Sequence, residues 1–506
     1  MYTEINYNNL LNEQWLAEVQ PLNAVTGINA GKGIRTGQHF KDSLNDGRAV
    51  WVDGQRISNV STADGFTGAI NTMAGLYDLQ FSDVQDKMTV RDEDDVRISA
   101  SYLMSRTQQD LQLKRNNSEI WSRKTLGFMG RFPDYCSNLI VGLRNIAPDL
   151  AKGHPLFAQN AINYHKYCAQ NDLALTHALN DQFFDRKANA NGQPDPDLIL
   201  KVVRETPQGI YVRGLKNLAT LSPICDEAIV YSNRPRGVGE EEQALAFAIP
   251  MNSAGLSIVC RDLYGKGRSQ KRLPLSTRFD EIDATLIFDD VFVPWNRIFV
   301  YKNPPLISRL IGLMNPHWSG YATLLRLVSK METTVGVLEL LSEWDGKLSF
   351  PNIQMKIGEI VADINVLQAC LRTMEIDANL TEAGYLAPAS NDAYRLFGVQ
   401  ASDRAEAIME DVAASALIPT GSETDLDIPQ LGGLIQRFFK GLAPSSRDQM
   451  RLMAIAGDMT QSSFGARTQL YERYHMGSPD MIYHRLYKKT PTAHWRTRVQ
   501  EFINEL

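Results

Sequence analysis

A glycine-rich segment at residues 27–37, GINAGKGIRTG, has the composition of a phosphate-binding loop. A nucleotide-binding loop of the Walker type needs Gly-Lys followed by Ser or Thr, because that hydroxyl binds the magnesium ion. Here Gly33 follows Lys32, and the spacing of Gly31, Gly33 and Gly37 does not match the dinucleotide-binding pattern either. We therefore interpret the segment as a flexible connection.

Residue types that bind metals gather in STRFDEIDATLIFDDVFVPW, residues 276–295. The acids alternate with apolar residues, which predicts a strand and a turn, with Asp280 pairing with Arg278. No histidine has the HExxH spacing of zinc hydrolases, so we expect no metal. Among His39, His154, His165, His317, His475, His484 and His494, we expect only His317 to lie near a pocket. The five cysteines form no CxxC pair, which indicates buried thiols in a reducing compartment.

Composition excludes several classes of function. The 506 residues include 43% hydrophobic and 22% charged residues, which is typical of a folded globular protein. Lys+Arg 52 and Asp+Glu 58 give a net charge of −6, which does not favour nucleic-acid binding. The N-terminus has no basic stretch like that of a secretion signal, and polar residues interrupt apolar runs such as 306–314. We expect a cytoplasmic protein that neither binds nucleic acid nor enters a membrane.

The elements that must position any site fall into consecutive blocks, which differ in the spacing of their apolar residues. Helical spacing at 69–79 and 98–121 predicts long helices, and Asp53-Gly54 predicts a hairpin turn. Short apolar, β-branched segments then predict an antiparallel β domain, and later repeats at three and four residues predict a helical bundle. This order gives an α+β protein with segregated layers. The predicted units are an arm at 1–35, a helical domain at 36–172, a β domain at 173–301 and a bundle domain at 302–506.

A set of segments, in one order along the chain, carries a resemblance to a known family. They are TGQHFKDSLNDGRAVWVDGQRISNVS (36–61), WSRKTLGFMGRFPDY (121–135), LALTHALNDQFFDR (173–186), GLKNLATLSPICDEAIVYS (214–232), STRFDEIDATLIFDDVFVPWNRIFVY (276–301) and TQSSFGARTQLYE (460–472). Together they resemble the oxygenase component of the two-component 4-hydroxyphenylacetate 3-monooxygenases. The resemblance implies an acyl-CoA-dehydrogenase-like fold: a helical N-terminal domain, a β middle domain and a C-terminal four-helix bundle.

The resemblance also implies a reaction and its partners. A separate NAD(P)H:flavin reductase supplies reduced FAD (FADH2), and O2 is the co-substrate. A C4a-hydroperoxyflavin then hydroxylates a phenol ortho to its hydroxyl, which gives a catechol. The implied assembly is a homotetramer, a dimer of dimers. The identity of the phenol stays open, because loops near 232–240 and 261–275 shape the pocket.

The residues that match the family's phenol site are Arg131, Tyr135 and His177. Arg131 offers a fixed positive charge for a phenolate. Tyr135, four residues later, would share a helical face with Arg131, although Pro133 intervenes. His177 is expected to titrate near neutrality and to take the phenolic proton. Ser232 and Asn233 match a substrate-gating loop of the family.

The residues that match the family's flavin site lie in three places. Thr220 is expected to face the flavin ring, where a hydroxyl steadies the oxygenated flavin. Arg467 is expected either to pair with the flavin pyrophosphate or to be a solvated surface residue. The Phe183-Phe184 pair departs from the family, which more often has Pro-Gln or Pro-Pro there. The full set is Phe183, Phe184, Asp185, Arg186, Thr220, Gln461, Ser462, Ser463, Phe464 and Arg467.

Two rival enzymes share the predicted fold. A 4-hydroxybutyryl-CoA dehydratase needs cysteine ligands for an iron–sulfur cluster, and Cys136 is out of register and alone. An acyl-CoA dehydrogenase needs a carboxylate base on the bundle, for which Glu332, Glu339 and Glu359 are candidates. The segments above fit both rivals less well. A non-catalytic interaction protein is a third alternative, against which the complete Arg–Tyr–His set argues.

Overall fold

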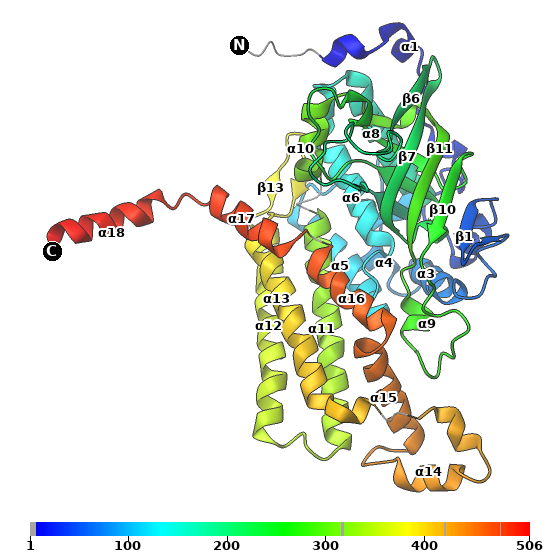
Figure 1. Ribbon diagram of the computed structural model, residues 1–506, viewed down its shortest axis with the longest axis vertical. Helices are drawn as coiled ribbons and strands as arrows, with labels where there is room; N and C mark the ends of the chain where they lie inside the picture. The colour runs from blue at the N-terminus through cyan, green and yellow to red at the C-terminus, as the bar shows by residue number, and fades with distance from the viewer. Residues whose placement is uncertain (1–6, 315–317, 419–420, 476) are drawn as a thin grey trace.

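The computed structural model describes residues 7–314, 318–418, 421–475 and 477–506 (Figure 1). His317, expected near a pocket, lies outside these residues. The N-terminal block is largely helical, as predicted. Its main helices are α2 (Gly37–Ser43), α3 (Thr67–Leu79), α5 (Gln108–Lys124), α6 (Pro133–Asn145) and α8 (Pro155–Asn171).

The long helix expected at 98–121 begins later than predicted. Residues Arg97–Ser99 form strand β4, which pairs with β3 (Thr89–Arg91), and α5 starts only at Gln108. The reason is local: Thr107 caps the helix by accepting a hydrogen bond from the backbone of Asp110, whose side chain accepts one from Thr107 in return. Such a reciprocal capping box fixes where a helix begins.

The middle block forms a six-stranded sheet in the order β2-β1-β10-β11-β7-β6. The predicted hairpin around Asp53-Gly54 is confirmed, and its first strand pairs in parallel with β10, so it extends the middle sheet. A second, four-stranded sheet has the order β12-β9-β8-β5, in which β5 and β8 are parallel. The sheets are therefore mainly but not wholly antiparallel. The bounds are β1 (Ala49–Val52), β2 (Gln55–Ile57), β5 (Leu175–Ala178), β6 (Lys201–Thr206), β7 (Gly209–Thr220), β8 (Glu227–Val230), β9 (Ala246–Pro250), β10 (Leu256–Cys260), β11 (Asp283–Pro294) and β12 (Ile298–Val300).

The acidic segment is strand architecture, as expected from its alternation. In β11 the apolar residues Leu286 and Val291 are buried, whereas Asp289 and Asp290 are exposed where the register shifts at a bulge. The expected pairing of Asp280 with Arg278 is wrong. Asp280 instead accepts a hydrogen bond from Nη2 of Arg261 at 2.6 Å, because Arg261 follows β10 and lies beside the start of β11.

The C-terminal block is the predicted helical bundle, with a core of its own. Its main helices are α11 (Trp318–Trp344), α12 (Pro351–Ile376), α13 (Asp392–Ala413) and α15 (Ser446–Thr460). Helix α16 (Ser463–Tyr474) runs back from α15 toward the other blocks, whereas α18 (Ala493–Glu505), beyond α17 (Pro479–Lys489), extends away from the body of the molecule (Figure 1). The predicted arrangement of a helical block, a β block and a C-terminal helical bundle is thus confirmed, while the boundaries of the blocks stay predictions.

The glycine-rich segment is docked, so its interpretation as a flexible connection is wrong. The backbone N–H of Gly33 donates to the carbonyl of Gln170, and that of Asn29 donates to the Asn171 side chain. Arg35 is fully buried and forms an ion pair with Asp226. A buried pair of this kind fixes the segment against α8 and β8.

The described residues show neither a membrane-spanning helix nor a metal-binding cluster. None of their helices combines the length and the apolar character that a membrane span requires. No group of three or more His, Cys, Asp or Glu side chains among them is arranged to hold a metal ion.

Candidate active site

Arg131 lies in a short loop that directly precedes helix α6. Pro133 opens α6, because proline needs no hydrogen-bond partner for nitrogen in the first turn. Arg131 therefore precedes the helix, and the expectation that it shares a helical face with Tyr135 is wrong. Gly130 is required here: a Cβ atom at this position would lie 2.3 Å from the hydroxyl oxygen of Tyr471 on α16.

The structure nevertheless brings the three predicted phenol-site residues together. The guanidinium carbon of Arg131 lies 3.7 Å from the ring centroid of Tyr135. The ring centroids of Tyr135 and His177 are 5.6 Å apart, in an edge-to-face arrangement. All three side chains are buried. Two of the residues come from the helical block, and His177 comes from strand β5 of the middle block.

The guanidinium of Arg131 is held without a carboxylate partner. Its Nη1 donates to the hydroxyl of Tyr471 and to the carbonyl of Gly130. Its buried Nε has no hydrogen-bond partner, and none of the carboxylates that the structure describes lies within 4.0 Å of its charge. A buried cation with an unused donor is suited to bind an anionic oxygen.

His177 does not titrate near neutrality in this site, contrary to expectation. Burial, and then the positive charge of Arg131, lower its pKa well below the ordinary value. Its imidazole is therefore neutral at pH 7 and carries one donor and one acceptor nitrogen. Nδ1 lies 3.0 Å from the hydroxyl of Tyr231, which leaves Nε2 for a ligand.

Two aromatic residues of this cluster were not predicted from the sequence. Tyr231 follows strand β8, and Tyr471 lies on α16, where its ring stacks on His475 at a centroid distance of 4.1 Å. Tyr471 is part of the segment 460–472 that carries the family resemblance, one helical turn after Arg467. Because residues four apart share a helical face, this spacing could have predicted that Tyr471 lies beside Arg467.

The predicted flavin residues near position 183 lie next to strand β7. The backbone N–H of Asn217 donates to the carbonyl of Asn180 at 2.8 Å, which fixes the segment after β5 along β7. Phe184 and Leu218 are 63% and 59% exposed, whereas Phe183 is half-buried beneath the guanidinium of Arg234. Asp185 and Arg186 are exposed. Phe184 and Leu218 are therefore large apolar side chains that the described chain leaves exposed.

Thr220 and Arg467 meet at one carboxylate. The Thr220 hydroxyl donates to Oδ1 of Asp283 at 2.7 Å. Arg467 donates to both oxygens of Asp283, from Nε at 2.9 Å and from Nη2 at 2.8 Å, and its Nη1 donates to Glu281 at 2.7 Å. The expectation that Arg467 is a solvated surface residue is wrong, because its side chain is largely buried. Its pairing with the flavin pyrophosphate stays a prediction; in this structure the guanidinium donates to protein carboxylates.

The remaining flavin residues form the start of α16. Ser462 caps the helix by accepting a hydrogen bond from the backbone of Gly465. Phe464 is buried against Phe128, so it supports the helix, whereas Gln461 and Ser463 are exposed. Through Arg467 and Asp283, this helix end is tied to Thr220 at the end of β7. The structure thus connects two of the three predicted flavin segments.

The two predicted gating residues are held by side chains of the segment that follows β5. The Ser232 hydroxyl donates to Asp181 at 3.1 Å, and Arg236 and Lys216 form ion pairs with the same carboxylate. Asn233 is exposed and bonds to Asn180. The first part of the 232–240 loop is therefore anchored to the segment that follows β5.

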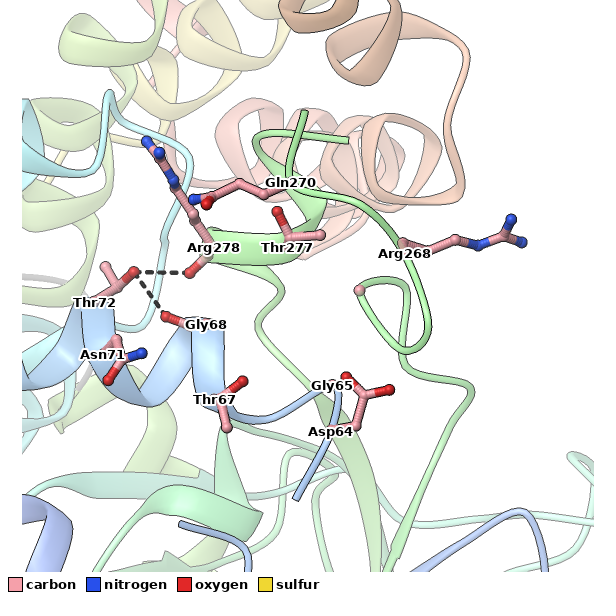
Figure 2. Close-up of a pocket in the computed structure, with 11 residues that line it drawn as sticks. Asp64, Gly65, Thr67, Gly68, Asn71, Thr72, Arg268, Gln270, Thr277 and Arg278 are labelled. Atoms are coloured by element: carbon pink, nitrogen blue, oxygen red, sulfur yellow. Dashed lines mark hydrogen bonds between the residues drawn. The ribbon is translucent and has the colours of Figure 1, made fainter. Parts of the chain in front are cut away.

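The loop at 261–275 borders a separate cavity of about 410 Å³ at the start of α3 (Figure 2). Its lining is mainly polar, and Arg278 and Gln270 lie close together at one side. None of the predicted phenol-site or flavin-site residues lines it. The roles of both loops in shaping a substrate pocket stay predictions.

The residues that the rival enzymes need are placed differently. Cys136 is buried and free, and no other cysteine is bonded to it. On the bundle, Glu339 and Glu359 are exposed and Glu332 is half-buried, so none of them faces the Arg131 cluster as a buried base.

Known proteins of one family are similar to this chain in sequence and in fold. Models of the 4-hydroxyphenylacetate 3-hydroxylase N-terminal and C-terminal domains match residues 36–300 and 315–504. The chain is 34% identical to the 4-hydroxyphenylacetate 3-monooxygenase oxygenase component of Thermus thermophilus, over 93% of this chain and 98% of that protein. A solved structure of such an oxygenase component complexed with FAD and 4-hydroxyphenylacetate superimposes with a TM-score of 0.88, at 33% identity, with 93% of this chain and 98% of that chain covered.

A solved 4-hydroxybutyryl-CoA dehydratase from N. maritimus is also similar, with a TM-score of 0.85 at 16% identity, over 93% of this chain and 95% of that chain. That likeness concerns the fold alone. The family models cover both helical blocks and the sheets between them, and the identity to the Thermus protein extends over nearly the whole chain. The chain belongs to the 4-hydroxyphenylacetate 3-hydroxylase family.

Proposed function

We propose that the chain is the oxygenase component of a two-component, FADH2-dependent aromatic monooxygenase that converts a phenol into a catechol. The observation that carries the proposal is the guanidinium of Arg131. It is buried, has an unused donor and no carboxylate partner among the described residues, and lies beside Tyr135 and neutral His177. That environment suits a phenolate, which is the electron-rich form of the substrate.

The roles of the three residues follow from their surroundings. Arg131 supplies the positive charge that favours the phenolate over the phenol. His177 offers Nε2 to the phenolic oxygen while Tyr231 holds Nδ1. Because Arg131 disfavours a second positive charge, a proton taken by His177 must leave the site again. Tyr135 packs against both groups and excludes water from them.

The cofactor of the family is FAD, and the residues present fit it. Phe184 and Leu218 would cover one side of the ring, with Thr220 at its polar edge and the start of α16 close by. Reduced FAD, together with O2, supplies the electrophilic oxygen atom for the reaction. The chain itself binds and orients the phenol, keeps its oxygen ionised and excludes water.

The finer properties of the assembly belong to this proposal. A separate NAD(P)H:flavin reductase supplies the reduced FAD, and the thiols described as free are consistent with a cytoplasmic location. The homotetramer is supported by apolar side chains that no part of the described chain covers. Helix α18 exposes Trp495, Val499, Phe502 and Ile503 by more than half each, at the spacing of one helical face. Helix α12 also exposes four apolar side chains, which are 41–76% exposed: Met355, Val361, Val366 and Ile376.

The proposal is tested by mixing the purified chain with chemically reduced FAD and oxygenated buffer, with and without a panel of phenols. Catechol formation from one panel member, measured by chromatography, is the expected result. R131M and H177Q are expected to lose at least about 100-fold in hydroxylation, while FADH2 oxidation continues and releases H2O2. Wild-type turnover by either variant would remove the role assigned to that residue.

A further inference from the structure

We propose that Arg467 is a positioning residue that keeps the charge of Arg131 available to a phenolate, because it holds the carboxylate of Glu281 in another ion pair. The proposal rests on the function proposed for Arg131. It assigns to Arg467 a task within the protein, beyond the pyrophosphate contact expected from the sequence.

Glu281 is the carboxylate most closely tied to Arg131. It is 1% exposed, and its Oε1 accepts the backbone N–H of Arg131 at 2.5 Å. It therefore contacts the residue but not its guanidinium. Its Oε2 accepts Nη1 of Arg467 at 2.7 Å. Each carboxylate oxygen of Glu281 thus has a donor, and neither donor belongs to the guanidinium of Arg131.

Arg467 cannot easily leave this place, because it is held from the other side. Its Nε and Nη2 form a two-pronged contact with Asp283, whose second neighbour is Nε of Arg261 at 3.1 Å. Burial alone would raise the pKa of Asp283, but the charges of Arg467 and Arg261 lower it to about 2. The carboxylate is therefore ionised, and it fixes the guanidinium of Arg467 between β11 and Glu281.

The hydroxyl of Tyr471 completes the arrangement. It accepts a hydrogen bond from Nη1 of Arg131 without adding a negative charge. Its ring is fixed by His475, with an angle of 7° between the two ring planes. Arg131 is thereby oriented by neutral acceptors, while the nearby negative charges are balanced by Arg467 and Arg261.

Removal of Arg467 would leave Glu281 as a buried carboxylate without a cation. An unpaired buried charge is costly, so Glu281 would turn to a neighbouring cation. Arg131 is that neighbour, since Glu281 already bonds to its backbone. An Arg131–Glu281 pair would use the charge that is proposed to ionise the phenol, and the bound phenol would then ionise only at higher pH.

The experiment measures the apparent pKa of bound 4-nitrophenol, whose phenolate absorbs visible light. The full chain is loaded with reduced FAD under anaerobic conditions, because reduced flavin absorbs weakly in that range. For R467Q we expect the pKa of the bound probe to rise by at least one unit over wild type, which is a tenfold loss of phenolate preference. E281Q/R467Q is expected to return within twofold of wild type, because the competing carboxylate is gone.

Matched variants separate this role from a merely structural one. Arg404 makes a similar two-pronged contact with Asp363 in the bundle, so R404Q is expected to leave the pKa of the probe unchanged. R467K retains a cation beside Glu281 and is expected to stay closer to wild type than R467Q. If R467Q folds poorly, R467M and E281Q/R467M give the same comparison, because methionine also removes the cation beside Glu281.

Two outcomes would overturn the proposal. One is an unchanged pKa of the bound probe in R467Q, and the other is a double variant as impaired as R467Q. The variant R131M distinguishes a failure of the role proposed for Arg131 from a failure of the role proposed for Arg467. If R131M ionises the probe as wild type does, the role of Arg131 itself is wrong. If R131M loses that ability while R467Q keeps it, only the role of Arg467 is wrong.

Discussion

Asp181 is the residue whose replacement tests most directly how the gating loop is held. Its Oδ1 accepts Nζ of Lys216 at 2.6 Å, and its Oδ2 accepts the guanidinium of Arg236 and the hydroxyl of Ser232. The side chains of Asp181, Lys216 and Arg236 are at most 3% exposed. In D181N the amide keeps the size of the side chain but no longer balances two buried cations.

The expected loss can be bounded from these contacts. Breaking a buried ion pair by removal of one partner costs about 3–5 kcal/mol, because the other charge stays buried. Burial already lowers the pKa of Lys216, so in D181N that lysine can release its proton and relieve part of the cost. We therefore expect D181N to lose about 3–5 kcal/mol of unfolding free energy near pH 7, and less at higher pH.

The assay is urea unfolding followed by tryptophan fluorescence and circular dichroism, with limited proteolysis of the 232–240 loop. D181N is expected to unfold at lower urea and to be cleaved faster in the loop, with a raised KM for the phenol. D411N is the matched control, because Asp411 pairs with Lys356 at an exposed site where such pairs contribute at most about 1 kcal/mol. K216M should be milder than D181N, since it keeps the pair of Asp181 with Arg236.

A stability loss below about 1 kcal/mol in D181N, equal to that of D411N, would refute the reasoning. It would mean that Lys216 and Arg236 either become solvated or repel each other only weakly when the carboxylate of Asp181 is absent. If D181N loses the expected stability but its proteolysis and KM are unchanged, Asp181 stabilises the fold without controlling the 232–240 loop.

Two further predictions concern a buried acid and the terminal helix. Burial raises the pKa of Asp134 to about 7. Because the same carboxyl titrates near 4 in the unfolded chain, the free energy of unfolding of the wild type falls as the pH rises from about 4 to 7. D134N should therefore gain stability over wild type progressively across that range and by a constant amount above it, as measured by thermal unfolding at several pH values; an equal gain at every pH would contradict the cause. Deletion of residues 493–506 should reduce the mass of the assembly in light scattering and leave the monomer folded, whereas a tetramer of unchanged stability would exclude α18 from the interface.

Some of the site could be found from the sequence because its signals are local. The alternation in 276–295 is visible in a few residues, and β11 follows from it. Pro133 and the capping Thr107 act within one helical turn of the elements that they begin. The errors at 98–107 and 27–37 have different reasons. At 98–107 two local features outweigh the helical spacing, namely the pairing of β4 with β3 and the capping of α5 by Thr107. At 27–37 the deciding contact is distant in sequence, because Arg35 docks on Asp226.

The sequence by itself determined the order of helical and β blocks, the family, and the identities of Arg131, Tyr135 and His177, because residue types and their order are written along the chain. Only the tertiary structure decided how those residues behave. The pKa of His177 depends on burial and on Arg131, and the partner of Arg467 depends on where β11 meets α16. Charge, dielectric surroundings and hydrogen-bond partners are properties of groups brought together in space, over separations of up to 340 residues between Arg131 and Tyr471.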